Sequence, residues 1–384
     1  MENNETLKEV ISKEFNSHKF INIFNNDSSI SFWKQDKNDV SQALKFVTNN
    51  KHTIISDIIS LIIDNTYDLL GRINCIVKLP KINVKKDFKD NIRISWEKFA
   101  ILNFFSSAIM KVNDINFTLT PRDILIYYLF YNKSEKIPKL NDNWETTIEF
   151  KEKKIIHPWP MTLDTRTYLK LFLLEKSINI AYKLNNINKL IKMQELINEQ
   201  WIDIELNIDK IEYDNLKYDF YLDQYIISPS DKEYFLKQEI IDNNIKQIYE
   251  ISNSSPKMNL ILPFPIESIF WMASKNINNI SMNFDSICKS CKLHIGSLGT
   301  RFNLPEIITK TSGHIKNIHK FDFSIHSDTL DFINGLCPTN DSTFIYNLEI
   351  DIESSHKYNL YIIVLAIRKL IYKKIENNFK LVEI

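Results

Sequence analysis

The sequence predicts a mainly β protein built from two consecutive sandwich domains. Three observations lead to this prediction: apolar and polar residues alternate along many short segments, helical spacing is confined to a few places, and the alternating segments occur in both halves of the chain. A length of 384 residues suits two domains, and a hydrophobic content of 44% supplies a core for each.

Composition excludes several classes of function. The 48 basic and 48 acidic residues give a net charge of zero, so no overall attraction to nucleic acid or anionic membrane is expected. Only 5 glycines occur, in neither a GxGxxG nor a GxxxxGK[ST] pattern, which excludes Rossmann and P-loop nucleotide sites. The 4 cysteines indicate a reducing compartment. No signal peptide or membrane span is visible, so a soluble cytosolic chain is expected.

Residues 1–50 are predicted to form an N-terminal arm or helix. Leu7, Val10, Ile11 and Phe15 recur at helical spacing, as in a short amphipathic helix. Such a helix caps its own domain, which is the simpler interpretation, or docks on a neighbour or a membrane surface.

The first sandwich is predicted over residues 51–228. Strands are expected at the alternating segments 73–79, 115–119, 178–184, 202–208 and 216–222. Pro80 and Pro121 end two of them because proline cannot donate to a strand ladder. The isoleucine-rich segment 54–63 has helical spacing, but its β-branched residues favour a strand.

Two helices are expected between strands. The apolar residues of segment 187–197 have helical spacing and predict an inserted helix. Ser230 and Glu233 form an S-x-x-E capping box, which predicts a helix over 231–241. This second helix places a linker at 229–243, between the two β-rich halves.

The second sandwich is predicted over residues 244–384. Its expected strands are 293–295, 321–325, 344–352 and 360–367. The last of these is apolar on both faces, which is typical of a strand in the middle of a buried sheet.

Several short motifs occur along the chain in a fixed order. They are Asp68–Arg72 before Val77–Pro80, Trp96 before 108–117, Tyr218–Asp223 before Ile245–Ile248, Leu262–Trp271, Leu293–Phe302, Phe321–Ser324 before 335–342, and Leu360–Ile371. In this order they resemble the double jelly-roll major capsid proteins of nucleocytoplasmic large DNA viruses, a family that includes the poxvirus scaffold protein. Leu262–Trp271 and Leu293–Phe302 are the most specific. The chain lacks the Ser-Gly of one family turn and is short for the family, which implies small outer towers.

The resemblance implies two consecutive eight-stranded jelly rolls with short inserted helices, and a viral capsid protein whose homotrimers tile an icosahedral shell. It implies no enzymatic activity and no cofactor. The implied partners are copies of the chain, minor capsid proteins and an internal viral membrane, without direct contact to nucleic acid. The implied location is the virion capsid, and the host cytoplasm during assembly. A poxvirus-like transient scaffold, a minor capsid paralogue, a jelly-roll carbohydrate-binding protein and a cupin-like metalloenzyme stay open as alternatives.

Cys288 and Cys291 form a CxxC pair, with His294 three residues further on and His314 and His319 beyond it. A structural metal site needs a second pair of ligands at matching spacing, and the sequence offers none that is clear. Two structural thiols are therefore the favoured interpretation, with Cys291 facing away from the apolar side of its strand or exposed.

Two further groups of residues are candidates for a functional site. His157–Pro160 contains a histidine next to a tryptophan between prolines, but no nucleophile or carboxylate partner is evident, so a structural turn is favoured. Asp203, Glu205 and Asp209 share one face of a predicted strand and could hold a cation, although a solvated face explains them more simply.

A small basic group lies near the C-terminus, formed by Arg368, Lys369, Lys373 and Lys374. It could contact membrane phosphates or an acidic neighbour, but Glu376 dilutes it and a solvated end is favoured. The sequence accordingly assigns no catalytic, cofactor-binding or metal-binding residue.

Overall fold

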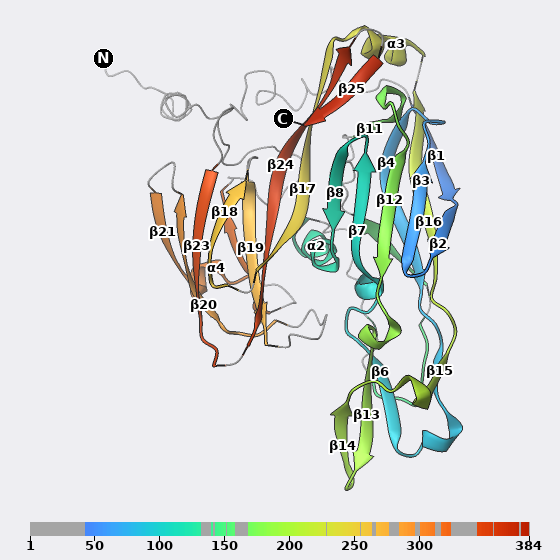
Figure 1. Cartoon of the computed structure of the whole chain (residues 1–384), viewed down its shortest axis with the longest axis vertical. Coiled ribbons are helices and arrows are strands. Elements are labelled where there is room, and N and C mark those ends of the chain that lie inside the picture. Colours follow the sequence, from blue (N-terminus) through green and yellow to red (C-terminus); the bar gives the residue numbers. More distant parts are fainter. Residues whose placement is uncertain are drawn as a thin grey trace. The chain divides into compact units, whose positions relative to one another are not determined.

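The computed structural model describes residues 43–131, 140, 143–150, 152–157, 168–227, 229–253, 255–262, 266–275, 284–295, 300–311, 316–323, 344–355, 357–375 and 378–383. The chain divides into two compact units. One consists mainly of Gln42–Asn243 together with Leu370–Ile384, and the other mainly of Asn244–Ile277 and Asn283–Lys369. Each unit contains one β-sandwich, which we call the first and the second sandwich in chain order (Figure 1).

The first sandwich consists of two antiparallel sheets. One has the strand order β1 (Ala43–Asn50), β16 (Lys217–Ile227), β4 (Leu69–Lys78), β10 (Lys153–His157), with the short β11 (Leu169–Lys170) also paired to β4. The other has the order β2 (His52–Ile55), β3 (Ile58–Ile63), β12 (Ile178–Leu184), β7 (Phe105–Val112), β8 (Ile115–Leu119).

The second sandwich is also built from two sheets. One has the order β17 (Ile240–Asn253), β24 (Asn359–Ile375), β19 (Ile266–Ser274), β22 (His319–Asp322). The other has the order β18 (Lys257–Leu262), β23 (Phe344–Ile352), β20 (Cys288–Ile295), β21 (Thr300–Pro305). The final strand β25 (Asn378–Glu383) pairs with the C-terminal end of β24.

The two sandwiches have the same topology. When the principal strands of the first sandwich are numbered along the chain, leaving out β2 and the inserted strands, both sandwiches have one sheet in the order 1-8-3-6 and one in the order 2-7-4-5. This eight-stranded arrangement is a jelly roll. The predicted fold class, two consecutive jelly rolls with short helices, is confirmed.

The core of the first sandwich follows from period-two alternation. On β4 the side chains of Ile73, Cys75 and Val77 are fully buried, and the residues between them are partly exposed. Their antiparallel partners on β16 include Phe220, which lies opposite Cys75 and is also fully buried. Both strands lie inside their sheet, so one face of each packs into the core.

The core of the second sandwich is formed by both of its sheets. Trp271 of β19 and Val364 of β24 belong to one sheet of this cluster, and Leu293 of β20 and Leu348 of β23 belong to the other. The residues of β24 from Ile362 to Ala366 are all fully buried, as are most residues of β19. The expected doubly buried central strand is therefore confirmed.

Two small sheets are inserted into the first sandwich. One has the order β14 (Gln200–Ile204), β13 (Ile191–Ile197), β6 (Ile92–Trp96), and the other the order β15 (Ile211–Tyr213), β5 (Ile82–Val84), β9 (Thr147–Ile148). Their strands come from three connections, those between β4 and β7, between β8 and β10, and between β12 and β16. The β6–β13–β14 sheet lies at one end of the first sandwich in Figure 1.

The helices are short. They are α2 (Pro121–Ile126), which continues into the π-helical turn η4 (Tyr127–Tyr131), α3 (Pro229–Lys237), α4 (Glu306–Thr309), and the 3-10 turns η2 (Lys86–Phe88), η3 (Leu102–Phe104), η6 (Leu171–Leu173), η7 (Ile187–Lys189) and η8 (Ile208–Lys210). A capping box starts α2, because the Thr120 hydroxyl accepts from the Asp123 N–H and the Asp123 carboxylate accepts from the Thr120 N–H. In both sandwiches a helix follows the fifth principal strand. Among the described residues no helix has the length and apolarity needed to cross a bilayer.

Several local predictions are corrected by the structure. The helix expected at 187–197 is wrong: this segment is the turn η7 followed by β13, in which Ile191 and Met193 alternate into the core. The strand expected at 202–208 ends at Ile204, and a 3-10 turn follows. The weak preference for strand over helix at 54–63 is confirmed by β2 and β3.

The ends of the predicted segments also differ. Residues 43–50, expected within the N-terminal arm, form the edge strand β1. The linker helix α3 covers Pro229–Lys237, and β17 begins at Ile240. The predicted N-terminal helix around Leu7 to Phe15 lies outside the described residues.

Candidate functional site

His157 is a core residue of the first sandwich. It ends β10 and is fully buried, with the Tyr182 hydroxyl 3.5 Å from its Nδ1 and the Phe105 ring centroid 6.0 Å from its own. Burial lowers the pKa of His157 from 6.5 to about 3. The structural interpretation therefore fits this histidine, and Pro158–Pro160 lie outside the described residues.

Both cysteines of the CxxC pair lie in the core of the second sandwich. A bulge in β20 adds Lys289 between Cys288, which is opposite Ile352, and Ser290, which is opposite Asp351. The extra residue turns both thiols to the buried face, so the expectation that Cys291 is outward or exposed is wrong.

Burial raises the pKa of each of these thiols to about 12. Both thiols are therefore neutral and pack as small apolar side chains of the core. His294 alternates to the opposite, outward face of β20, where the Asn347 Nδ2 lies 3.3 Å from its Nδ1. Among the described residues no three His, Cys, Asp or Glu side chains are grouped as metal ligands would be. His314 lies outside them.

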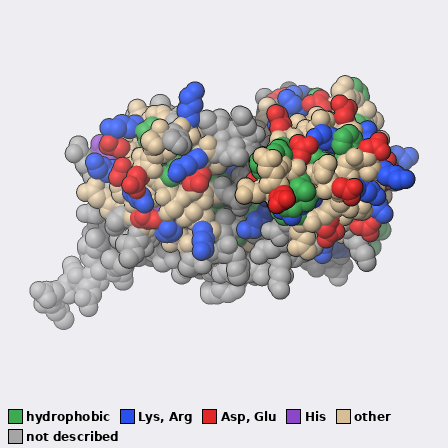
Figure 2. All heavy atoms as spheres, turned by 90° about the horizontal axis from the view of Figure 1, so that it is seen from below, with side chains coloured by type: hydrophobic (Ala, Val, Ile, Leu, Met, Phe, Trp, Pro, Cys, Tyr) green, Lys and Arg blue, Asp and Glu red, His purple; other side chains and the backbone are tan. Residues whose placement is uncertain are grey.

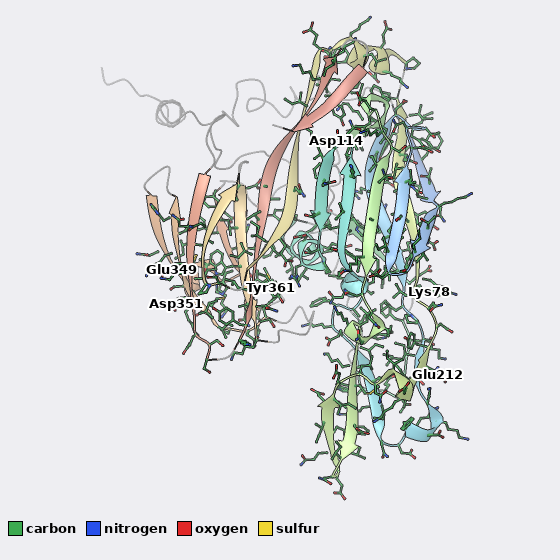
Figure 3. All side chains as sticks on the ribbon, viewed as in Figure 1. Lys78, Asp114, Glu212, Glu349, Asp351 and Tyr361 are labelled. Atoms are coloured by element: carbon green, nitrogen blue, oxygen red, sulfur yellow. The ribbon has the colours of Figure 1, made fainter. Side chains whose placement is uncertain are left out.

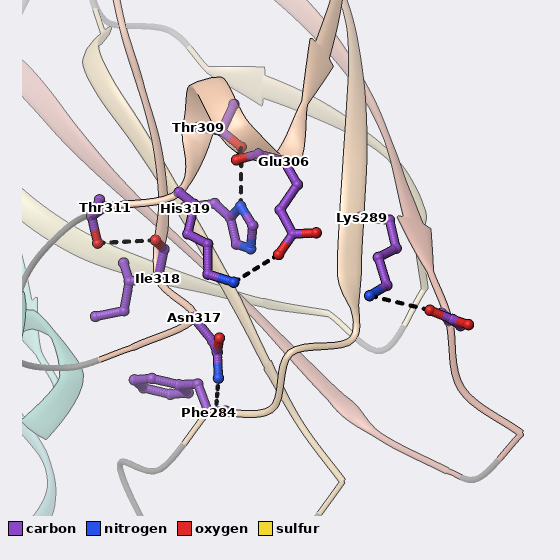
Figure 4. A network of polar contacts seen from close by, with 10 residues as sticks. Phe284, Lys289, Glu306, Thr309, Thr311, Asn317, Ile318 and His319 are labelled. Carbon is purple, nitrogen blue, oxygen red and sulfur yellow. Dashed lines mark hydrogen bonds and ion pairs between the residues drawn. The ribbon is translucent and has the colours of Figure 1, made fainter.

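His319 stabilises the second sandwich through stacking and a hydrogen bond. Its ring lies parallel to that of Trp271 at a centroid distance of 5.7 Å, and its Nδ1 is 3.0 Å from the Thr309 hydroxyl. Figure 4 shows this contact beside the ion pair of 2.7 Å between Glu306 and Lys310. Burial lowers the pKa of His319 to about 4, although the negative charge of Glu306 acts to raise it.

The two buried histidines predict that the fold loses stability in mild acid. Their pKa values of about 3 and about 4 lie below the value of 6.5 that each would have when unfolded. The unfolded chain therefore binds more protons, and the stabilisation present above pH 6.5 declines as the pH falls toward 4. Each histidine contributes at most about 1.4 kcal/mol per pH unit.

This pH dependence is measured by urea unfolding at intervals between pH 7 and pH 5. We expect His157→Phe or His319→Phe to reduce the slope of unfolding free energy against pH. A wild-type stability that is flat over this interval would contradict the assignment of two buried, neutral histidines.

The carboxylates predicted to share a strand face do not gather around a point. Asp203 is on β14 and accepts a hydrogen bond of 2.6 Å from the Gln194 side chain, whereas Glu205 follows the end of the strand. Asp209 lies in η8. All three are exposed, which fits the solvated face that the simpler interpretation expected.

The described part of the basic C-terminal group belongs to the strand pair β24–β25. Lys374 donates through its Nζ to the Leu236 carbonyl at 2.8 Å, at the end of α3, and Lys373 is exposed. The side chains of Arg368 and Lys369 lie outside what the structure describes.

A stack of side chains lies on the β6–β13–β14 sheet. The guanidinium of Arg93 is 4.4 Å from the ring centre of Trp201 and 5.4 Å from that of Trp144. Its Nε donates to Gln194 at 2.7 Å, and Gln194 in turn donates to Asp203. The stack brings together side chains from three inserted segments, which contain Arg93, Trp144 and Trp201. The stack was not predicted from the sequence, where its local signal is the alternation of Ile92, Arg93 and Ile94.

Charges on the insertion end are mixed. Figure 2 looks at the molecule from this end and shows acidic and basic side chains interspersed with apolar ones. Such a surface creates no strong field of one sign, in agreement with the zero net charge of the chain.

Asp68, in the first of the resembling motifs, connects strands to the linker helix. Its carboxylate accepts from Lys232 Nζ of α3 at 2.7 Å and from the buried Ile227 N–H at 3.1 Å. Its own N–H donates to the Tyr225 carbonyl at 2.9 Å. Gly71 follows, where an added Cβ would lie 3.0 Å from the Tyr225 ring. The motif thus fixes the start of β4 against β16 and α3.

Comparison with solved structures identifies the fold. The chain is similar to the Faustovirus major capsid protein, with a TM-score of 0.65, 7% identity and coverage of 85% of this chain and 90% of that one. The PBCV-1 VP54 structure fitted into a reconstruction of the virophage Sputnik gives a TM-score of 0.60 at 10% identity, covering 88% and 96%. The Sputnik virophage structure gives 0.52 at 9% identity, covering 90% and 89%.

These likenesses span nearly the full length of both partners in each pair. The chain has the double jelly-roll fold of viral major capsid proteins, as the order of its motifs implied. No family model and no curated protein matches the sequence. The fold is therefore recognised through structure, at identities of 7% to 10%.

Proposed function

We propose that the protein is a capsid structural protein whose trimers tile an icosahedral shell. The observation that carries this proposal is the pair of jelly rolls with the same strand order in one chain, matched over 85% or more of its length by viral capsid proteins. Because each subunit contains two similar sandwiches, an assembly of three subunits contains six similar blocks. The outline of such an assembly approximates a hexagon.

Nothing in the described parts of the candidate sites favours catalysis. The buried histidines and thiols have pKa values shifted toward their neutral forms and belong to the cores, as described above. We propose that the chain has no enzymatic activity and that its partners are copies of itself, minor capsid proteins and an internal viral membrane, without direct contact to nucleic acid. Its location would be the virion capsid, reached from the host cytoplasm during assembly.

Sedimentation velocity of the purified full chain tests the trimer. We expect a species with three times the chain mass of 45.4 kDa at micromolar concentration. A monomer at every accessible concentration, with no ordered assembly in particles, would contradict the proposal.

The second candidate is a transient scaffold or minor capsid paralogue. It is favoured by the small size of the two inserted sheets, which have three strands each. Quantitative mass spectrometry of purified mature and immature particles separates the roles. A capsid protein persists in mature particles at high copy number, a scaffold is confined to immature ones, and a minor component is present at few copies.

A further inference from the structure

Exposed apolar side chains gather on the outward face of one sheet of the first sandwich, the β2–β3–β12–β7–β8 sheet (Figure 1). We call the following five residues the isoleucine face: Ile55, Ile58 and Ile62, which are 72%, 42% and 63% exposed, Ile109, which is 45% exposed, and the exposed Ala181. Apolar side chains that gather in this way, unlike scattered single ones, mark an interaction surface.

Strand register places these side chains on the same face of the sheet. Ile55 is opposite Ile58 in the β2–β3 pair. Ala181 of β12 is opposite Ser60 of β3 and also opposite Ile109 of β7. Because residues two apart on a strand share a face, the isoleucines on either side of Ser60 face outward with Ala181. The small Ala181 side chain therefore lies between larger isoleucines on the two neighbouring strands.

The charged side chains on this face of the sheet are all basic. Lys183 is opposite Ile58, and Lys111 lies in the row of Ile62, because both are opposite Asn179. The two lysines are exposed, and neither is in an ion pair with another described residue. The outward positions of the five strands, all of which the structure describes, contain no carboxylate. A surface that fits is therefore apolar and acidic.

Residues 1–15 of the same chain have this complementary pattern. Leu7, Val10, Ile11 and Phe15 recur at the spacing of one face of a helix. The segment contains four glutamates and two lysines, so its acidic side chains outnumber its basic ones. An isolated helix of this length is marginal in water, so its apolar side chains need a surface to pack against.

The length of such a helix matches the isoleucine face. A helix over residues 7–15 is about 13 Å long, at about 1.5 Å per residue. Ile58 and Ile62 lie four residues apart on β3, which is also about 13 Å, at about 3.3 Å per residue. A helix aligned with β3 and β12 would cover the face from the row of Lys183 to the row of Lys111. Helices packed on one face of a sheet are a common layer arrangement.

The connection to β1 favours the chain's own segment over that of a second copy. Residues 16–42 separate the segment from β1, which begins at Ala43 in the same sandwich. A connection of this length can span up to about 90 Å, at about 3.3 Å per residue, which is several times the width of a five-stranded sheet. The tether keeps the segment at an effective concentration on the order of 1 mM, roughly a thousand times that of a second copy in micromolar solution.

From these observations we infer that residues 7–15 form a helix that packs on the isoleucine face of its own chain, with carboxylates of residues 1–15 beside Lys111 and Lys183. The inference does not depend on the proposed function, because it concerns a single chain. It gives the expected N-terminal helix a place in the fold, as a cap on its own domain.

The test measures how fast a thiol introduced on the isoleucine face reacts. Ile109→Cys and the control Ile202→Cys change side chains that are both 45% exposed, and Ile202 lies on the inserted strand β14. Each full-length variant is treated with a maleimide, and peptide mass spectrometry separates the introduced thiol from the native ones. We expect the thiol at position 109 to react about tenfold more slowly, as for a face covered about nine-tenths of the time. Equal rates overturn the inference.

Matched variants show whether the slow reaction depends on the N-terminal segment. Leu7→Asp with Ile11→Asp places two charges on its apolar side, one helical turn apart. Ser12→Asp with Asn16→Asp places two charges at the same spacing on its polar side. Combined with Ile109→Cys, the first pair should restore fast labelling and the second should leave it slow. Labelling that stays slow with the first pair overturns the inference.

Cross-linking of the wild-type chain distinguishes its own segment from that of a second copy. A lysine-reactive reagent is expected to join Lys8 or Lys13 of the segment to Lys111 or Lys183. The band with the mass of one chain, 45.4 kDa, is isolated by denaturing electrophoresis and digested. Cross-links of this kind in that band support the inference. Their absence from it, or their presence only in bands of two or more chains, overturns it and leaves the proposed function standing.

Discussion

Replacing Trp271 with alanine is expected to lower the free energy of unfolding by about 3–5 kcal/mol. The side chain is 1% exposed, lies in the centre of the second core and stacks on His319. Its removal leaves a cavity that the strands of the two sheets cannot close without shifting relative to one another. Guanidinium unfolding of the full chain, followed by circular dichroism, measures the loss.

Tyr234→Ala is the control for this prediction. Tyr234 is an aromatic residue of α3 that is 46% exposed. Its replacement should change the free energy of unfolding by no more than about 0.5 kcal/mol. Similar losses for the two variants would show that Trp271 is not part of a packed core.

Replacing Asp68 with alanine is expected to cost about 1–3 kcal/mol. The change removes the acceptor for the Ile227 N–H, which is buried, and leaves Lys232 without its partner. The ion pair itself contributes little of this cost, because the Lys232 side chain is 42% exposed and its charge stays hydrated. Denaturant unfolding of Asp68→Ala against wild type measures the effect.

A surface ion pair supplies the comparison for Asp68. Asp114 lies 3.4 Å from Lys176, with both side chains more than 60% exposed, and Figure 3 labels it in the turn between β7 and β8. Asp114→Ala should cost less than about 1 kcal/mol. If Asp68→Ala costs no more than Asp114→Ala, the carboxylate of Asp68 does not hold β16 and α3 in place.

Strands that lie in the middle of a sandwich were predictable from the sequence. β4, β12 and β23 show regular alternation because one face of each packs into a core, and β24 is apolar on both faces because both are buried. The order of the resembling motifs supplied the jelly-roll topology, which alternation alone cannot provide.

The inserted segments were not predictable in the same way. The apolar residues of segment 187–197 have helical spacing in the sequence. In the structure Ile187 belongs to a 3-10 turn, and the residues of β13 pair with β6. This tertiary pairing overrides the local preference for a helix. The period-two pattern of the sequence also cannot reveal the bulge at Lys289. This bulge places the side chains of Cys288 and Cys291 on the same face of β20.

The outer face of β3 shows what alternation can and cannot indicate. The apolar character of Ile58 and Ile62 was visible in the sequence, but whether their face is covered within the fold depends on neighbours far along the chain. The structure leaves this face exposed in one chain. Sequence supplies the chemistry of such a face, and structure shows whether the fold itself covers it.

Electron microscopy of the purified full chain tests the central claim most directly. We expect negative-stain class averages of threefold particles with a near-hexagonal outline, produced by six similar sandwiches from three chains. Averages that show single, separate pairs of sandwiches at concentrations where capsid proteins assemble would contradict the account.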